Sequence, residues 1–205
     1  MLDSMRWTIS PTLQLLAGLV FLLLPACGPK VPALHMLAPL PHEQTCRIAV
    51  IPFMNETDYP QAGAIVYRVF MAELVRSGRF DVVRQGDIRD LFHDLRIWPG
   101  QQPRTEQMKI LGDRLGAKIV ITGTVVEMTE VANAGIVNPT LAVSLNIVET
   151  DPVHLLWCTY HRREGEQYRK VMHFGVVNTV TSLAQLVSQE VLELWLKEGL
   201  RGCAG

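Results

Sequence analysis

The sequence predicts an α/β fold in which a mixed β-sheet is flanked by helices in three layers, with the element order βαβααβββα. Two observations carry this prediction. The nearly continuous apolar run from Ile48 to Ile51 is typical of a strand covered on both faces, and helical patterns follow it. Between residues 141 and 148 apolar residues recur with a period of two, and the short links that join the last three strands favour an antiparallel meander.

Residues 47–127 carry the signals of a βαβ unit followed by two helices and a strand. Pro52 stops the first strand, 47–53, and the apolar stripe over 62–77 indicates a helix with Gly78 as its cap. Such a unit favours a parallel pair of strands joined by a right-handed crossover. The later elements are expected in the order strand 80–84, helix 87–95, helix 105–115 and strand 118–127.

Residues 141–200 are expected to form two further strands and a final helix. A turn at Asp151-Pro152 separates the strands 141–148 and 154–162, and the helix over 180–197 has one apolar face. The connection from Met128 to Thr140 is expected to be a loop. It is too short to supply membrane-spanning strands, which need about 9 to 11 residues each.

Residues 1–26 have the order of a signal peptide. Arg6 supplies a positive flank, and an apolar run follows from Leu13 to Leu24. As a helix this run would be about 18 Å long, which is short against a hydrocarbon core of about 30 Å. Asp3 is unusual in a positive flank, so Met5 is a second candidate for the true start, beside Met1.

The apolar run ends in Leu24-Pro25-Ala26-Cys27-Gly28, which resembles the bacterial lipobox. The resemblance implies cleavage before Cys27 and a covalent lipid on its sulfur, and no other cofactor is expected. Gly28, where an Asp would mark retention in the inner membrane, implies the periplasmic face of the outer membrane. Several acyl chains on one residue give stable anchoring. The alternative is an ordinary signal peptide with a chance cysteine.

A proline-rich segment follows the lipidation residue. Residues 27–45 contain four prolines, which favour extended polyproline conformations, and we expect a tether there. The α/β domain is then expected over 46–200, with a tail over 201–205.

Three cysteines remain beyond the leader: Cys46, Cys158 and Cys203. An oxidising compartment permits disulfides, but three cysteines allow at most one intramolecular bond. Cys46 and Cys158 fall in predicted strands, where buried free thiols are the simplest interpretation. Which of the three cysteines form a disulfide stays open at this point.

Composition and motifs argue against several function classes. The chain has 19 Lys+Arg and 20 Asp+Glu, so it lacks the basic excess typical of nucleic-acid partners. The six histidines show no metal-ligand spacing, and the chain has neither a nucleophile elbow nor a phosphate-binding glycine loop. We therefore expect no catalytic residues, no metal site and no enzymatic activity.

Five segments carry a family resemblance: Ile48-Ala-Val-Ile-Pro-Phe-Met-Asn55, Leu74 to Gly78, Phe80-Asp-Val-Val-Arg84, Ile88-x-x-Leu91 and Leu115 to Gly123. In this order they resemble the superfamily that contains the TolB N-terminal domain and the outer-membrane lipoproteins CsgG, LpoB and PelC. Size and layout are similar to those of PelC-type lipoproteins. The resemblance implies a TolB N-terminal-like fold with structural roles for the motif residues Pro52, Phe53, Asn55, Gly116 and Gly123.

The resemblance also implies a function class. Members of the superfamily are generally binding or assembly modules, and several form rings. It implies a lipid-anchored homo-oligomer that serves as a scaffold in an envelope export apparatus, for exopolysaccharide or protein secretion, with other proteins of that apparatus as partners. The alternative is a regulatory module that activates an envelope enzyme such as a peptidoglycan synthase.

Three further residues are candidates for a membrane or subunit contact. Trp98 stands beside Pro-Gly in a predicted loop, where it either packs back on the core or remains exposed at an interface. Arg162 and Arg163 begin a charged run that is expected to be a solvated turn, with a contact between subunits or with a polysaccharide as the alternative. Trp157 and Trp195 lie on patterned elements and are expected in the core.

Overall fold

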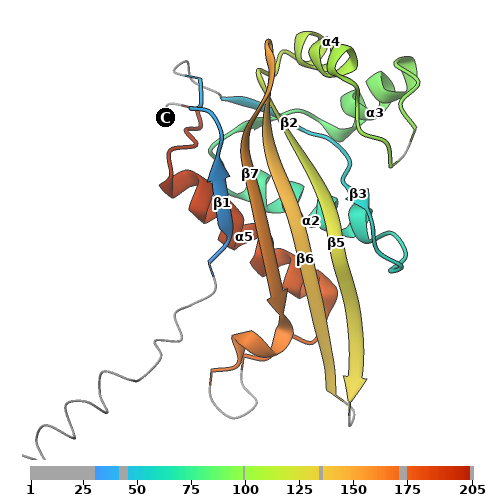
Figure 1. Cartoon of the computed structure of the whole chain (residues 1–205), viewed down its shortest axis with the longest axis vertical. Coiled ribbons are helices and arrows are strands. Elements are labelled where there is room, and N and C mark those ends of the chain that lie inside the picture. Colours follow the sequence, from blue (N-terminus) through green and yellow to red (C-terminus); the bar gives the residue numbers. More distant parts are fainter. Residues whose placement is uncertain (1–30, 42–45, 99, 134–135, 171–174, 204–205) are drawn as a thin grey trace, which may run out of the picture. The chain divides into compact units, whose positions relative to one another are not determined.

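The computed structural model describes residues 31–41, 46–98, 100–133, 136–170 and 175–203 (Figure 1). Residues 31–205 belong to one compact unit. The expected signal peptide, 1–26, and the lipidation residue Cys27 lie outside the described residues.

Seven strands form one mixed sheet in the order β1-β7-β6-β5-β2-β4, and β3 pairs with β5. The pairs among β2, β3, β4 and β5 are parallel, whereas β1, β5, β6 and β7 form antiparallel pairs. The strands are β1 (Ala33–Met36), β2 (Arg47–Val50), β3 (Met54–Asn55), β4 (Asp81–Val82), β5 (Ile119–Asn133), β6 (Ile136–Thr150) and β7 (Val153–Glu164). The predicted parallel unit and antiparallel meander are therefore both confirmed.

Helices cover both faces of the sheet and complete the predicted three layers. Figure 1 shows α2 and α5 behind the long strands, and α3 and α4 near the top of the view. They are α2 (Ala62–Arg76), α3 (Gln85–Asp94), α4 (Thr105–Leu115) and α5 (Val180–Lys197), with a short 3₁₀ helix η1 (Gly165–Tyr168) before α5. All nine predicted elements are present.

Two apolar cores lie on opposite faces of β2. Ile48 and Val50 pack in the larger core with α2 and α5, and this core contains Phe70 and Trp195. Ala49 and Ile51 pack in the smaller core with α3 and α4. Both faces of β2 are thus covered, which explains its uninterrupted apolar sequence.

The prediction of a tether over residues 27–45 is wrong for residues 33–36, because these residues form β1 and pair with β7. The backbone N–H of Leu37 continues the contact by donating to the Leu156 carbonyl over 2.8 Å. Pro32 and Pro39 stand on either side of β1 and leave its ladder intact. The segment is ordered because the edge of β7 offers it hydrogen-bond partners.

The loop expected between Met128 and Thr140 is also wrong. β5 continues to Asn133 and β6 starts at Ile136. The two strands therefore form a long hairpin in which each strand has 15 residues. Their register continues to the pair Asn133 and Ile136. Polar residues such as Glu130 and Asn138 hide the strand signal, and pairing between the two strands overrides their low propensity.

A disulfide joins Cys46, next to β2, to Cys203 near the end of the chain, and Cys158 is free. The expectation of a free thiol is therefore wrong for Cys46. The Cys203 backbone N–H also donates to the Arg79 carbonyl over 2.7 Å. The expected tail is consequently fixed to the domain as far as residue 203.

Candidate functional site

The motif residues after β2 shape the connection between β2 and α2. β2 ends at Val50, two residues before Pro52, and the side chain of Phe53 turns into the larger core. Asn55 holds the following loop: its Nδ2 donates to the Tyr59 carbonyl over 3.0 Å, and the Thr57 backbone N–H donates to its Oδ1 over 3.0 Å. These contacts fix the loop between Asn55 and Tyr59.

The two motif glycines are needed for different reasons. Gly116 caps α4 with a φ of 62°, a left-handed conformation that favours glycine. Gly123 lies in β5 beneath Phe53, where an added Cβ would come within 2.7 Å of the Phe53 ring and of Leu145. Both glycines therefore serve the fold.

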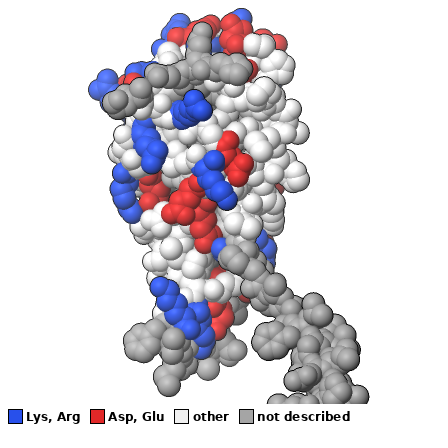
Figure 2. Space-filling model, turned by 90° about the vertical axis from the view of Figure 1, so that its left-hand side faces the viewer, with Lys and Arg blue, Asp and Glu red and all other residues white. Residues whose placement is uncertain are grey.

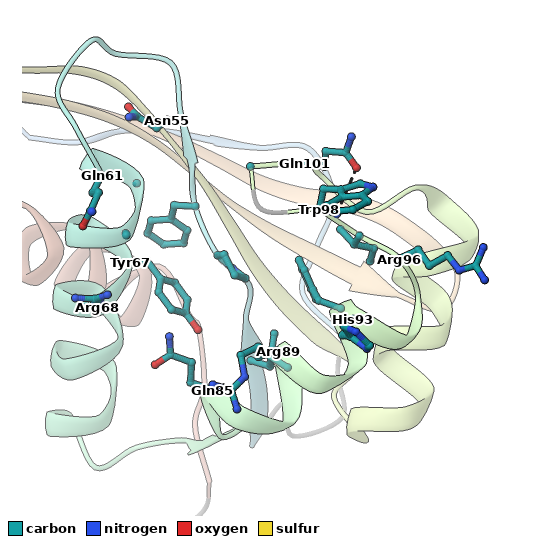
Figure 3. Close-up of a pocket in the computed structure, with 18 residues that line it drawn as sticks. Asn55, Gln61, Tyr67, Arg68, Gln85, Arg89, His93, Arg96, Trp98 and Gln101 are labelled. Atoms are coloured by element: carbon teal, nitrogen blue, oxygen red, sulfur yellow. Dashed lines mark hydrogen bonds between the residues drawn. The ribbon is translucent and has the colours of Figure 1, made fainter.

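A cavity of about 860 Å³ opens at the carboxyl end of β2, between α2 and α3 (Figure 3). Its apolar wall consists of Phe53 from the β2–α2 connection, Ile88 and Phe92 from α3, and Ile97 and Trp98 from the α3–α4 loop. Ligands commonly bind at the carboxyl ends of parallel strands.

Trp98 is one of the residues predicted as a contact, and it lies at this cavity. Its side chain is 71% exposed, so the alternative that it packs back on the core is wrong. The side chain of Gln101 accepts a long hydrogen bond of 3.4 Å from the Trp98 backbone N–H, which supports the loop. Trp157 and Trp195 are buried, as predicted.

The cavity also contains a buried hydroxyl that the sequence analysis did not identify. Tyr67 on α2 lines the cavity and is only 3% exposed, and its hydroxyl has no hydrogen-bond partner in the described part of the chain. Burial raises the pKa of Tyr67 to about 12, so the hydroxyl stays protonated at neutral pH. Tyr67 occupies a position on the apolar stripe of a helix, so nothing in the sequence distinguishes it from an ordinary core residue.

The second feature is a sheet face, here called the open face, that lies opposite α2 and α5. It consists of three rows of residues paired across β5, β6 and β7. Alternate residues of β6, from Leu141 to Ile147, belong to the core with α2 and α5, and the residues between them point to the open face. The rows are Thr122–Asn146–Cys158, Thr124–Ser144–Tyr160 and Glu127–Ala142–Arg162.

Arg162 lies on the open face and is held by two carboxylates. Its Nε donates to Glu127 over 2.8 Å and its Nη1 donates to Glu164 over 2.6 Å. The hydrogen bond from Arg162 lowers the pKa of Glu127 despite the opposing effect of its burial. β7 continues through Glu164, so the expectation of a solvated turn starting at Arg162 is wrong.

Arg163 points to the opposite face, because neighbouring strand residues alternate. Its guanidinium donates twice to the Glu190 carboxylate on α5, each time over 2.8 Å, and it stacks over the Tyr168 ring. His161 and the Tyr168 hydroxyl also contact Glu190. This cluster fixes α5 to β7.

Charged residues of both signs lie next to one another on the side of the molecule where β1 lies. Figure 2 shows Lys and Arg interspersed with Asp and Glu there. Within the described residues no group of three or more His, Cys, Asp or Glu is placed to hold a metal ion. No helix in the described ranges has both the length and the apolar character needed to cross a membrane.

The structure thus separates the three predicted contact residues. Trp98 lies at the cavity, Arg162 lies on the open face, and Arg163 lies between β7 and α5. Strand alternation could have separated the two arginines in the sequence, had the strand been predicted to include both.

Known proteins resemble this chain in sequence over part of its length and in fold over most of it. The TolB amino-terminal domain family matches residues 41–132. No curated protein matches the sequence. Among solved structures, a PelC dodecamer from Paraburkholderia phytofirmans is similar with a TM-score of 0.56 and 15% identity, covering 85% of this chain and 100% of that chain. Lipoprotein GNA1162 from Neisseria meningitidis is similar with a TM-score of 0.53 and 16% identity, covering 74% and 99% of the respective chains.

At these identities the two structures show a shared fold. The family match and the shared fold agree with the order of the motif segments between Ile48 and Gly123 and with the mixed sheet that these segments build. Residues 41–132 therefore match the TolB amino-terminal domain family in sequence.

Proposed function

We propose that this protein is a non-enzymatic lipoprotein of the outer membrane that faces the periplasm and assembles into a homo-oligomer. A lipid on Cys27 anchors it to the membrane. The oligomer serves as a scaffold in an envelope export apparatus, for exopolysaccharide or protein secretion.

The observation that carries the proposal is the shared fold with a protein whose structure is a dodecamer. The similarity covers 85% of this chain and the whole of the PelC chain, so it extends well beyond the family segment 41–132. A closed ring is built by head-to-tail contacts, which need two different complementary faces on each subunit.

The open face supplies one such surface. Its middle row places Tyr160, whose side chain is 43% exposed, beside Ser144 and Thr124. In the neighbouring row the buried Oδ1 of Asn146 has no hydrogen-bond partner among the described residues. A sheet face with an exposed aromatic side chain at its centre suits contact with a second copy of the chain.

Two features support an envelope location. The Cys46–Cys203 disulfide suits an oxidising compartment such as the periplasm. The lipobox-like segment ending in Cys27-Gly28 supplies the expected anchor. A structural rather than catalytic role is supported by the His161, Arg163 and Glu190 cluster, whose groups are engaged with one another between β7 and α5.

The test is the oligomeric state of the lipidated full-length protein, purified in detergent and measured by light scattering and native mass spectrometry. We expect a defined oligomer. Tyr160→Glu places a charge in the middle of the open face and should convert the oligomer to smaller species. Thr181→Glu is the matched control, because it adds the same charge at the exposed first turn of α5, where a carboxylate is tolerated.

The outcomes separate the proposed function from its alternative. Loss of assembly in Tyr160→Glu alone, with unchanged melting temperatures, supports an oligomer built on the open face. A wild-type protein that remains monomeric even when lipidated contradicts the scaffold and favours a regulatory module. Equal effects of both substitutions would show that the open face is not the contact.

A further inference from the structure

The cavity between α2 and α3 has the properties of a ligand site that the proposed assembly function does not use. Its volume of about 860 Å³ lies within the range of about 300 to 1,000 Å³ that is typical of small-molecule sites. Aromatic and aliphatic side chains form most of its wall, including Phe53, Phe92 and Ile97.

The charged side chains that line the cavity are all positive. Three arginines line it, Arg68, Arg89 and Arg96, and none of its lining residues is Asp or Glu. Arg89 forms a loose ion pair of 3.6 Å with its exposed neighbour Asp90, outside the cavity. Within the described part of the chain Arg68 and Arg96 have no carboxylate partner. The cavity therefore favours a ligand that carries negative charge.

The unpaired hydroxyl of Tyr67 indicates where a polar group of the ligand would bind. In Figure 3 it points toward the part of the cavity that Gln85 and Arg89 line. A buried donor without a partner costs about 1 to 3 kcal/mol of stability, and a ligand oxygen would remove this cost. Gln85 and Arg89 are exposed side chains on α3, so they are free to make room for such a group.

Backbone strain is concentrated at the same cavity. Gln61 and Arg96, with φ of 59° and 53°, are the non-glycine residues of the described chain that have positive φ, and both line the cavity. Gln61 precedes α2 and Arg96 follows α3, so each stands at the junction between a helix and a loop of the rim. Strained residues of this kind cluster at binding sites, where the surrounding structure maintains them.

We propose that the cavity binds a small amphipathic anion, a molecule with one carboxylate or phosphate group and an aliphatic or aromatic body. The anionic group lies near Arg89 and accepts a hydrogen bond from the Tyr67 hydroxyl. The apolar body lies along Phe53, Phe92 and Ile97, and the exposed indole of Trp98 covers it at the mouth.

Binding is tested with residues 31–205, which form one compact unit containing both cores and the disulfide. The probes share a 12-carbon chain and differ in the head group: dodecanoate, dodecyl phosphate, neutral dodecyl maltoside and dodecyltrimethylammonium. All are used below their micelle-forming concentrations, with titration calorimetry and intrinsic tryptophan fluorescence as readouts. We expect the anions to bind once per chain and at least about tenfold more tightly than the cation.

Two substitutions test the polar end of the site. Arg89→Gln should weaken dodecanoate binding by about tenfold or more, since a charge-assisted hydrogen bond is lost. Tyr67→Phe should also weaken binding of the anions, yet leave the free protein at least as stable, because the hydroxyl it removes is unpaired. Arg114→Gln is the matched control: this arginine lies on α4, outside the cavity, and is similarly exposed.

The pattern of affinities decides the proposal. A preference for dodecanoate or for dodecyl phosphate supports it, and identifies a fatty-acid or a phospholipid type of head group. Equal affinity for anionic, neutral and cationic probes would overturn it, as would Arg89→Gln and Arg114→Gln binding dodecanoate equally well. Neither result depends on whether the protein forms an oligomer.

Discussion

Trp195 on α5 donates a hydrogen bond of 2.7 Å from its indole Nε1 to Oγ1 of Thr159 on β7, and both side chains are completely buried. The bond satisfies the one polar atom of this completely buried tryptophan. Trp195 also packs edge-on against Phe70 of α2, with 5.9 Å between the ring centroids. The hydrogen bond and the ring contact together fix the rotation of α5 against the sheet.

The first prediction concerns this bond. Thr159→Val keeps the volume of the side chain but leaves the indole N–H buried without a partner, so it should lower the free energy of unfolding by about 1 to 3 kcal/mol. Urea unfolding measures the change. Thr129→Val, at an exposed position of β5, is the control and should have little effect. An equal loss in both variants would contradict a specific role for the bond.

The second prediction concerns the disulfide between Cys46 and Cys203. It closes a loop of 157 residues, so Cys203→Ser should lower the free energy of unfolding by about 2 to 5 kcal/mol. Cys158→Ser serves as the control, because Cys158 is free and half-buried. Reducing agent should destabilise the wild type and Cys158→Ser but leave Cys203→Ser unchanged. If it affects all three proteins alike, the assigned pairing is wrong.

The third prediction is a loss of stability in acid. Burial alone would raise the pKa of Glu190, but hydrogen bonds from His161 and Arg163 outweigh it and lower the pKa. Since this pKa is lower in the folded than in the unfolded chain, the stabilisation is complete above the unfolded value of about 4.3 and is lost as the pH falls through the folded value. Urea unfolding between neutral pH and pH 3 should therefore show falling stability.

Glu190→Gln tests the assignment. It should lower stability at neutral pH and remove this part of the pH dependence. Glu193→Gln, an exposed substitution on the same helix, should leave the pH profile as in the wild type. A Glu190→Gln profile parallel to that of the wild type would place the acid-sensitive group elsewhere.

The fourth prediction concerns the anchor. Cys27→Ser removes the sulfur to which a lipid is expected to attach, so the variant should not incorporate labelled fatty acid and should leave the membrane fraction or accumulate as precursor. Metabolic labelling with radioactive palmitate measures this directly. The prediction fails if the wild-type protein is also unlabelled.

The sequence by itself determined the elements whose signals are local. The apolar run Ile48 to Ile51 indicated a strand covered on both faces, and the stripes of α2, α4 and α5 indicated helices packed on a sheet. Side-chain periodicity depends on the helix or strand itself, so it is readable without knowledge of the partner element. The motif from Pro52 to Asn55 was readable for the same reason, because Asn55 binds within its own loop.

Only the tertiary structure decided the features that depend on contacts between distant segments. β1 is a strand because β7 pairs with it, and the hairpin extends to Asn133 because β5 and β6 support each other despite polar residues. Cys46 meets Cys203 because the fold brings the chain end to β2, a contact across 157 residues. The cavity beneath Trp98 has the same origin: Tyr67 and Arg89 come from separate helices, and only their packing on the sheet leaves the space between them.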